Sequence, residues 1–181
     1  MKTILKTLIL TVFLTLAFNC SDDDDGTTTT GNTQEYFKYT IDGVERIFDF
    51  EVEGHFETDA TTIDKFEINA SGEQPSGSLR RIAAAFTFDN TAFMPSTTYN
   101  WGIAQDSNTT EKFYFAESTS TNLFILTADF SAHPIVATVI PPNPVNVGEY
   151  LEFTFTGTFQ DGNNVTRSID GLCRVQRGMD Q

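Results

Sequence analysis

The sequence predicts an all-β protein, an antiparallel β-sandwich of about 8–10 strands, with a closed β-barrel as the alternative. From Glu35 onward, apolar and polar residues alternate over short stretches, as in strands that bury one face. Asp-Gly and Asn-rich turn signals separate these stretches. No window of 12 or more residues after position 35 keeps the 3.6-residue apolar stripe of an amphipathic helix.

Residues 1–19 have the pattern of a secretory signal peptide. Lys2 and Lys6 form a short positive region, and the stretch from Thr7 to Phe18 is almost purely apolar. A transmembrane helix needs about 20 apolar residues, so this stretch is too short to span a bilayer. It has the length of a signal-peptide core, and we therefore expect cleavage before Cys20.

Residues 16–20, Leu-Ala-Phe-Asn-Cys, resemble a bacterial lipoprotein box, although a small residue usually stands where Asn19 does. The acidic run that follows is Ser21, Asp22, Asp23, Asp24 and Asp25. It resembles the export signal of surface-exposed lipoproteins of the Bacteroidota, whose lipoprotein boxes are relaxed. The resemblance implies three acyl chains on Cys20, anchoring in the outer membrane and display on the cell exterior. The alternatives are an ordinary secreted protein without lipid, a periplasm-facing anchor, or a merely solvated charge run.

Residues 26–34, GTTTTGNTQ, are small and polar and show no hydrophobic periodicity. Together with Cys20 and the acidic run they are predicted to form a disordered tether over residues 20–34. The single β-domain is then expected to cover residues 35–181.

The first predicted hairpin joins residues 37–41 to 44–50 through Asp42-Gly43, a two-residue turn signal. In this pattern Phe48 and Phe50 share one apolar face. Further predicted strands lie at 66–70, 82–88, 99–103, 113–115 and 123–128.

The clearest strand is Leu151 to Phe159, with apolar residues, mostly Phe, on one face and threonines on the other. The turn Asp161-Gly162-Asn163-Asn164 follows, and then strands at 165–169 and 172–175. The three prolines within residues 137–147 exclude that stretch from a central strand, so we expect a long connection or an edge there. The opening and closing hairpins resemble those of small uncharacterised β-domains of these lipoproteins.

Composition excludes several kinds of partner. Removal of residues 1–19 would take away two lysines and leave nine Lys and Arg against 25 Asp and Glu. Such an acidic chain does not bind nucleic acid or an anionic lipid surface electrostatically. If Cys20 carries lipid, Cys173 has no partner for an internal disulfide, and its strand-like context predicts a small buried residue.

Three aromatic residues, Trp101, Tyr99 and Tyr114, are the candidate ligand-binding residues. Trp101 is the only tryptophan, and an exposed aromatic ring is a natural platform for the face of a sugar. The alternative, which the pattern favours for Trp101, is that the ring fills the core.

No catalytic, metal or cofactor site is expected. His55 and His133 lack ligand-spaced partners, and no nucleotide-binding loop or hydrolase motif occurs. Asp49, Glu51 and Glu53 share one strand face, with Glu57 beyond, a spacing that a glycoside hydrolase could use. A solvated face is the favoured interpretation of these carboxylates.

The sequence therefore predicts a membrane-anchored, non-catalytic binding module for a glycan or for another envelope protein. One alternative is a structural or adhesive surface protein without a small-molecule site. The other is a small carboxylate-dependent glycoside hydrolase.

Overall fold

A computed structural model describes residues 34–58, 63–73, 77–89, 93–102, 111–119, 123–125 and 132–181. Gln34–Gln181 forms one compact unit. The predicted signal peptide (1–19), Cys20, the acidic run Ser21 to Asp25 and most of the tether lie outside the described residues. The part of the chain that the structure describes contains no helix that could cross a membrane.

All eleven strands belong to one mixed sheet, so the all-β prediction is confirmed. The strands are β1 (Tyr36–Ile41), β2 (Val44–Phe48), β3 (Phe50–Thr58), β4 (Ile63–Glu73), β5 (Leu79–Asp89), β6 (Thr98–Trp101), β7 (Lys112–Thr119), β8 (Leu123–Ile125), β9 (Ile135–Ile140), β10 (Tyr150–Gln160) and β11 (Thr166–Gln176). Their order in the sheet is β2-β1-β11-β10-β9-β6-β7-β5-β4-β3, and β8 pairs with β7 off this path. The sheet curls until it is nearly closed, like a barrel.

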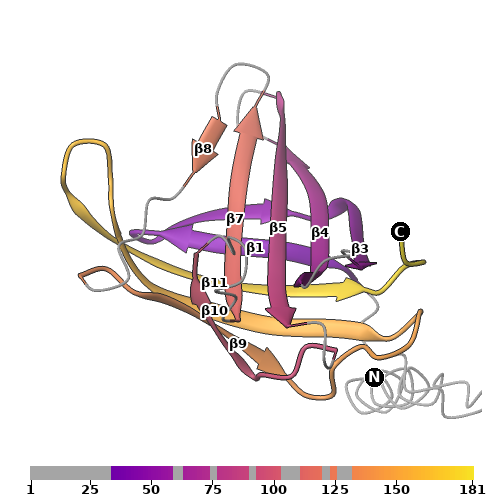
Figure 1. Ribbon diagram of the computed structural model, residues 1–181. Helices are drawn as coiled ribbons and strands as arrows, with labels where there is room; N and C mark the ends of the chain where they lie inside the picture. Colours follow the sequence, from indigo (N-terminus) through magenta and orange to yellow (C-terminus); the bar gives the residue numbers. More distant parts are fainter. Residues whose placement is uncertain are drawn as a thin grey trace, which may run out of the picture. The chain divides into compact units, whose positions relative to one another are not determined.

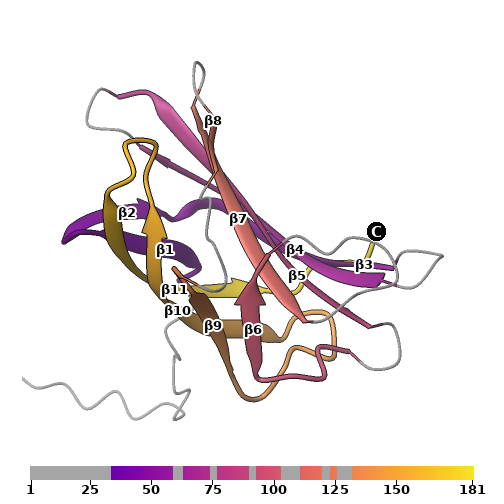
Figure 2. The same cartoon turned by 60° about the vertical axis from the view of Figure 1, so that its left-hand side comes forward.

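The sheet has two parts that differ in strand direction. We call β2, β1, β11, β10, β9 and β6 the first half, and β7, β5, β4 and β3 the second half. In Figure 1 the long strands of the first half run across the view while β4, β5 and β7 stand upright. The halves join where β6 pairs in parallel with β7, and Figure 2 shows β6 between β9 and β7. Such crossing packs the inner faces of the two halves against each other.

The two halves also contact each other away from the β6–β7 pairing. A bridge joins Gly54 of β3 to Arg177, and the Gly178 N–H donates to the Gly54 carbonyl oxygen at 2.6 Å. Near the other end, a Cβ atom on Gly72 would lie 2.2 Å from the Ile47 carbonyl oxygen. The backbone of β2 therefore passes directly over β4, and only glycine fits at that crossing.

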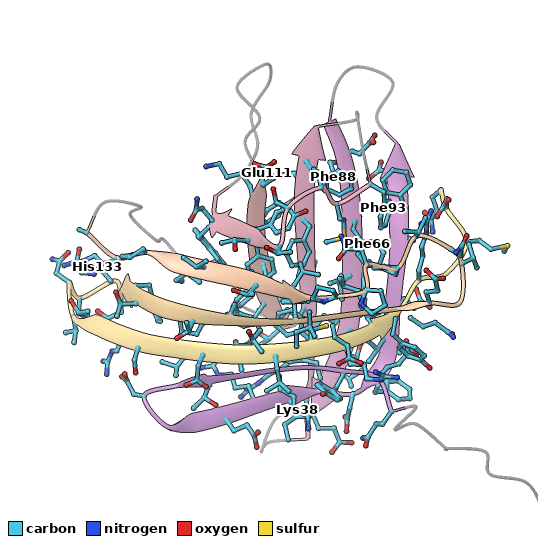
Figure 3. The ribbon with its side chains drawn as sticks, turned by 90° about the horizontal axis from the view of Figure 1, so that it is seen from below. Lys38, Phe66, Phe88, Phe93, Glu111 and His133 are labelled. Carbon is cyan, nitrogen blue, oxygen red and sulfur yellow. The ribbon has the colours of Figure 1, made fainter. Side chains whose placement is uncertain are left out.

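Aromatic rings fill the space between the halves. The side chains that are at most 1% exposed include Tyr39, Tyr99, Phe37, Phe48, Phe66, Phe86, Phe88, Phe113, Phe115, Phe153 and Phe155. Many of their contacts are edge-to-face, as between Phe86 and Phe153 at 4.8 Å between ring centroids. Figure 3 shows Phe66, Phe88 and Phe93 gathered together, apart from Lys38 on β1. Burying each ring stabilises the fold by roughly 2–3 kcal/mol, which makes aromatic packing the main source of stability.

Both predicted turns are confirmed. Asp42 and Gly43 have φ angles of 48° and 83°, and Ile41 pairs with Val44 across this two-residue turn. At the other turn, the Asp161 carboxylate accepts hydrogen bonds from the backbone N–H groups of Asn163 and Val165.

Arg167 links these two turns through hydrogen bonds. Arg167 donates to Asp42 at 2.8 Å and to Asp161 at 3.0 Å. The Arg167 hydrogen bond lowers the pKa of Asp42 from its ordinary value, and hydrogen bonds from the Val165 and Asn163 backbone chiefly lower that of Asp161. The β1–β2 hairpin is thereby fixed to the β10–β11 hairpin.

Two expectations about strands were wrong. Residues 135–140 form β9, a central strand between β10 and β6, whereas the sequence excluded residues 137–147 from such a position. The strand ends immediately before Pro141, so the three prolines occupy only the connection that follows. In addition, the separate strands expected at 165–169 and 172–175 are one continuous strand, β11.

Candidate functional site

Trp101 and Tyr99 lie in the core. Trp101 is 5% exposed and makes edge-to-face contacts with Phe113 and Phe115, at centroid distances of 5.8 and 5.2 Å. Tyr99 is fully buried against Phe86. Neither ring can offer a face to an external ligand, so the structure corrects the exposed-platform hypothesis for both residues.

Tyr114 has a different position, on the outer face of the second half. It lies between the buried residues Phe113 and Phe115, and its side chain is partly buried and packs against the core. Strand register places it in a cross-strand row with Ala85 of β5 and Glu67 of β4. Burial chiefly raises its pKa above the ordinary value, and the negative charge of Glu67 adds to this effect.

A groove of about 550 Å³ lies on this outer face, beside the Tyr114 row. The polar residues that line it are Glu51, Glu53, Asn69, Ser71, Arg81 and Ser118. Its depth follows from side-chain size, because Ala83 on β5 pairs with Ala116 on β7 and both end at Cβ. The groove is open and mixed in polarity, which suits recognition of hydroxyl-rich molecules rather than enclosure of an apolar one.

Phe50 lies beside the groove, next to the lining residues Glu51 and Ser71. It pairs with Ser71, which pairs with Arg81, which in turn pairs with Ser118, so these four residues form one row across the outer face. Phe50 is 57% exposed, whereas Phe48, two positions earlier, is fully buried. The expectation that both rings share an apolar face is therefore wrong.

A β-bulge explains why Phe50 points outward. The β3–β4 register shifts between Phe50 and Glu53, and Glu51 has a φ angle of 49°. Positive φ is uncommon for a residue with a Cβ, and it marks the extra residue of a bulge that redirects neighbouring side chains. Bulges of this kind are frequent beside binding sites.

The far side of the same face carries compensated charges. Lys65 lies 3.5 Å from a Glu57 oxygen and 3.9 Å from a Glu67 oxygen, and His55 lies 3.7 Å from Glu67. The Glu57–Lys65 and His55–Glu67 pairs form across β3 and β4, where residues directly opposite each other share a face, and Lys65 and Glu67 are two positions apart on β4. This network borders the groove and fixes the side chains around Tyr114.

The carboxylates singled out from the sequence are not brought together in a closed site. Asp49, Glu51 and Glu53 are exposed, and Glu57 pairs with Lys65. Glycoside hydrolysis needs one carboxyl group in an apolar environment and the other in a polar one. Solvent-exposed carboxylates such as Glu51 and Glu53 are instead suited to accept hydrogen bonds from ligand hydroxyl groups.

A buried polar cluster joins the halves behind the groove. The Tyr39 hydroxyl donates a hydrogen bond to the Glu117 carboxylate, and Arg46 donates to the same carboxylate at 2.8 Å. The Arg80 Nε lies 3.7 Å from the other oxygen of Glu117. Burial, followed by Glu117, strongly raises the pKa of Tyr39. The sequence hypotheses missed this cluster, although the alternation Phe113, Phe115, Glu117 places the carboxylate on the apolar face.

Cys173 is buried, as its context predicted, and burial raises the pKa of its thiol well above the ordinary value. Among the described residues, no group of three or more His, Cys, Asp or Glu is arranged to hold a metal ion.

Comparisons with protein-family models, with curated proteins and with solved structures give no significant match.

Proposed function

We propose that this protein is a non-catalytic glycan-binding lipoprotein that is anchored to the outer membrane through Cys20 and displayed on the cell exterior. One observation carries the binding part of the proposal, namely the exposed ring of Phe50 beside a polar groove on the outer face of β3, β4, β5 and β7. The ligand lies along this groove.

Glycan chemistry matches the groove in two ways. The C–H face of a sugar ring makes apolar contact with an aromatic ring, and Phe50 is the exposed phenylalanine among the described residues. The hydroxyl groups of a sugar both donate and accept hydrogen bonds. Glu51 and Glu53 accept them, Arg81 donates them, and Asn69 does both. The open ends of the groove suit an internal segment of a polysaccharide.

The location is supported by the sequence. A short apolar segment ends at Cys20, an acidic run follows, and a polar tether then leads to the domain. Attachment through several acyl chains is stable without a basic patch, in keeping with the excess of acidic residues. An anchored module on a tether can reach polysaccharides outside the membrane.

Binding of full-length protein, purified in detergent, to a polysaccharide array tests this function. We expect Phe50→Ala to lower the affinity for the bound polysaccharide at least tenfold, or about 1.4 kcal/mol. The matched control is Leu172→Ala, which removes another exposed apolar side chain from the first half. Absence of binding to every polysaccharide, or equal losses in the two variants, would contradict the proposal.

A further inference from the structure

Arg81 differs from the other arginines that the structure describes. Arg46 and Arg80 lie beside Glu117, Arg167 beside Asp42 and Asp161, Arg174 beside Glu152, and Arg177 beside Asp180. Among the described residues no carboxylate lies within 4.0 Å of Arg81, although the chain has 25 acidic residues and only 11 basic ones. In so acidic a protein, an unpaired guanidinium is an unusual feature.

The position of Arg81 is equally specific. It is exposed on the outer face of β5, it lines the groove, and it lies directly between Ser71 and Ser118 on the flanking strands. Residues that pair directly across strands have Cβ atoms about 5 Å apart, so the two serines flank Arg81 on the neighbouring strands. Ser71 is 4% exposed, whereas the Arg81 side chain is exposed and carries five N–H donors.

We propose that the ligand is an acidic glycan whose anionic group, a uronate carboxylate or a sulfate, is bound by Arg81 between Ser71 and Ser118. This inference rests on the glycan-binding function proposed above. The guanidinium donates two parallel hydrogen bonds to the anion, and the two hydroxyls donate to its remaining lone pairs. About two strand spacings, roughly 10 Å, separate Phe50 from Arg81, so the ring and the guanidinium contact different sugar units of one chain.

Glu51 and Glu53 limit which acidic glycans fit. Both carboxylates line the same groove and repel any anionic group placed near β3. A polymer with a charge on every sugar brings one charge to Arg81 and another toward these carboxylates. A polymer that alternates acidic and neutral sugars avoids this repulsion, and its neutral units donate hydroxyls to Glu51 and Glu53.

The test compares charged polysaccharides with neutral counterparts that have the same backbone. The probes are hyaluronan, alginate and polygalacturonate, each beside its carboxyl-reduced form, and carboxyl-reduced chondroitin sulfate beside its desulfated form. With full-length protein we expect at least tenfold tighter binding to the charged member of one or more pairs. The pairs also separate a carboxylate ligand from a sulfate ligand.

Variants then assign the preference to Arg81. Arg81→Ala is expected to remove the preference, so that the charged and neutral members of a pair bind equally, and Arg81→Lys is expected to retain part of the preference. Lys38→Ala removes the same charge from the first half and is expected to have no effect. Glu51→Gln combined with Glu53→Gln is expected to increase binding of polygalacturonate more than that of hyaluronan.

The two proposals fail in different ways. Equal binding to charged and neutral members of every pair, or an unchanged preference in Arg81→Ala, would overturn the inference and leave glycan binding standing. Binding to no polysaccharide would overturn both. Added salt should weaken binding of the charged probe and have little effect on that of the neutral one.

Discussion

The two halves of the sheet share one inner core but have different outer faces. On the first half, strict alternation produces a regular row of exposed threonines, Thr98, Thr138 and Thr154, on three neighbouring strands. On the second half, the equivalent row is Phe50, Ser71, Arg81 and Ser118, with a groove beside it. The comparison teaches that regular alternation produces a uniform outer face, whereas one bulge and a few small side chains produce a groove.

The largest expected effect separates the two phenylalanines that precede the bulge. Phe48→Ala removes a fully buried ring and should lower the free energy of unfolding by about 3–5 kcal/mol. Phe50→Ala removes an exposed ring and should change it by less than about 0.5 kcal/mol. Denaturant unfolding of both variants measures the difference, and similar losses would mean that Phe50 is not on the outer face.

The next effect concerns the crossing of the halves at Gly72. A methyl group there would meet the Ile47 backbone, so Gly72→Ala should destabilise the protein by about 1–3 kcal/mol. Gly162→Ala is the matched control, because nothing lies within 4 Å of the added atom. If thermal unfolding shows Gly72→Ala to be as stable as the control, the halves do not approach as described.

A comparable effect is expected for the buried cluster that joins the inner faces. Glu117→Gln keeps the shape of the side chain but weakens its interactions with Arg46 and Arg80, so we expect a loss of about 1–3 kcal/mol. Glu45→Gln, at an exposed position of β2, should be nearly neutral. Equal unfolding midpoints for the two variants would show that the cluster contributes nothing to joining the halves.

The smallest effect depends on pH and belongs to the turns of the first half. The pKa values of Asp42 and Asp161 are lowered in the folded protein, so their contribution to stability is present above the ordinary value of 3.8. It is lost as the pH falls further through the lowered folded values. Since both groups are exposed, the effect should be small and screened by salt.

The variant Arg167→Gln tests whether Arg167 stabilises the two turns. The stability difference between wild type and variant should shrink as the pH falls between about 5 and 2, and it should also shrink in high salt. A difference that is the same at every pH would show that the pairing of Arg167 with Asp42 and Asp161 does not stabilise the turns.

Local chemistry explains which parts of the fold were predictable. The turn at Asp42-Gly43 needs positive φ angles that these residues adopt easily, and the alternation in Leu151–Phe159 needs only one buried face. Each of these signals involves only residues that are close together in the sequence. The parallel pairing of β6 with β7 has no local signal, because it depends on how distant strands pack.

The site depends on the same kind of long-range effect. In the sequence, Phe48 and Phe50 follow one alternation, which predicts that both point inward. The break between β2 and β3 at Asp49 and the bulge at Glu51 together reverse this for Phe50, and both depend on how β3 pairs with the distant strand β4. The role proposed for Arg81 could not be predicted either, since only the structure shows that it has no acidic partner within 4.0 Å among the residues described.

The most direct test of the binding face is hydroxyl-radical footprinting of the full-length protein with and without a polysaccharide that it binds. Phe50 and Leu172 are both exposed, so we expect both to be oxidised in the free protein and each to serve as a reference for the other. We expect the ligand to reduce oxidation of Phe50 on the second half and to leave Leu172 on the first half unchanged. Protection of Leu172 with Phe50 unaffected would place the ligand on the threonine-lined face and contradict the proposed site.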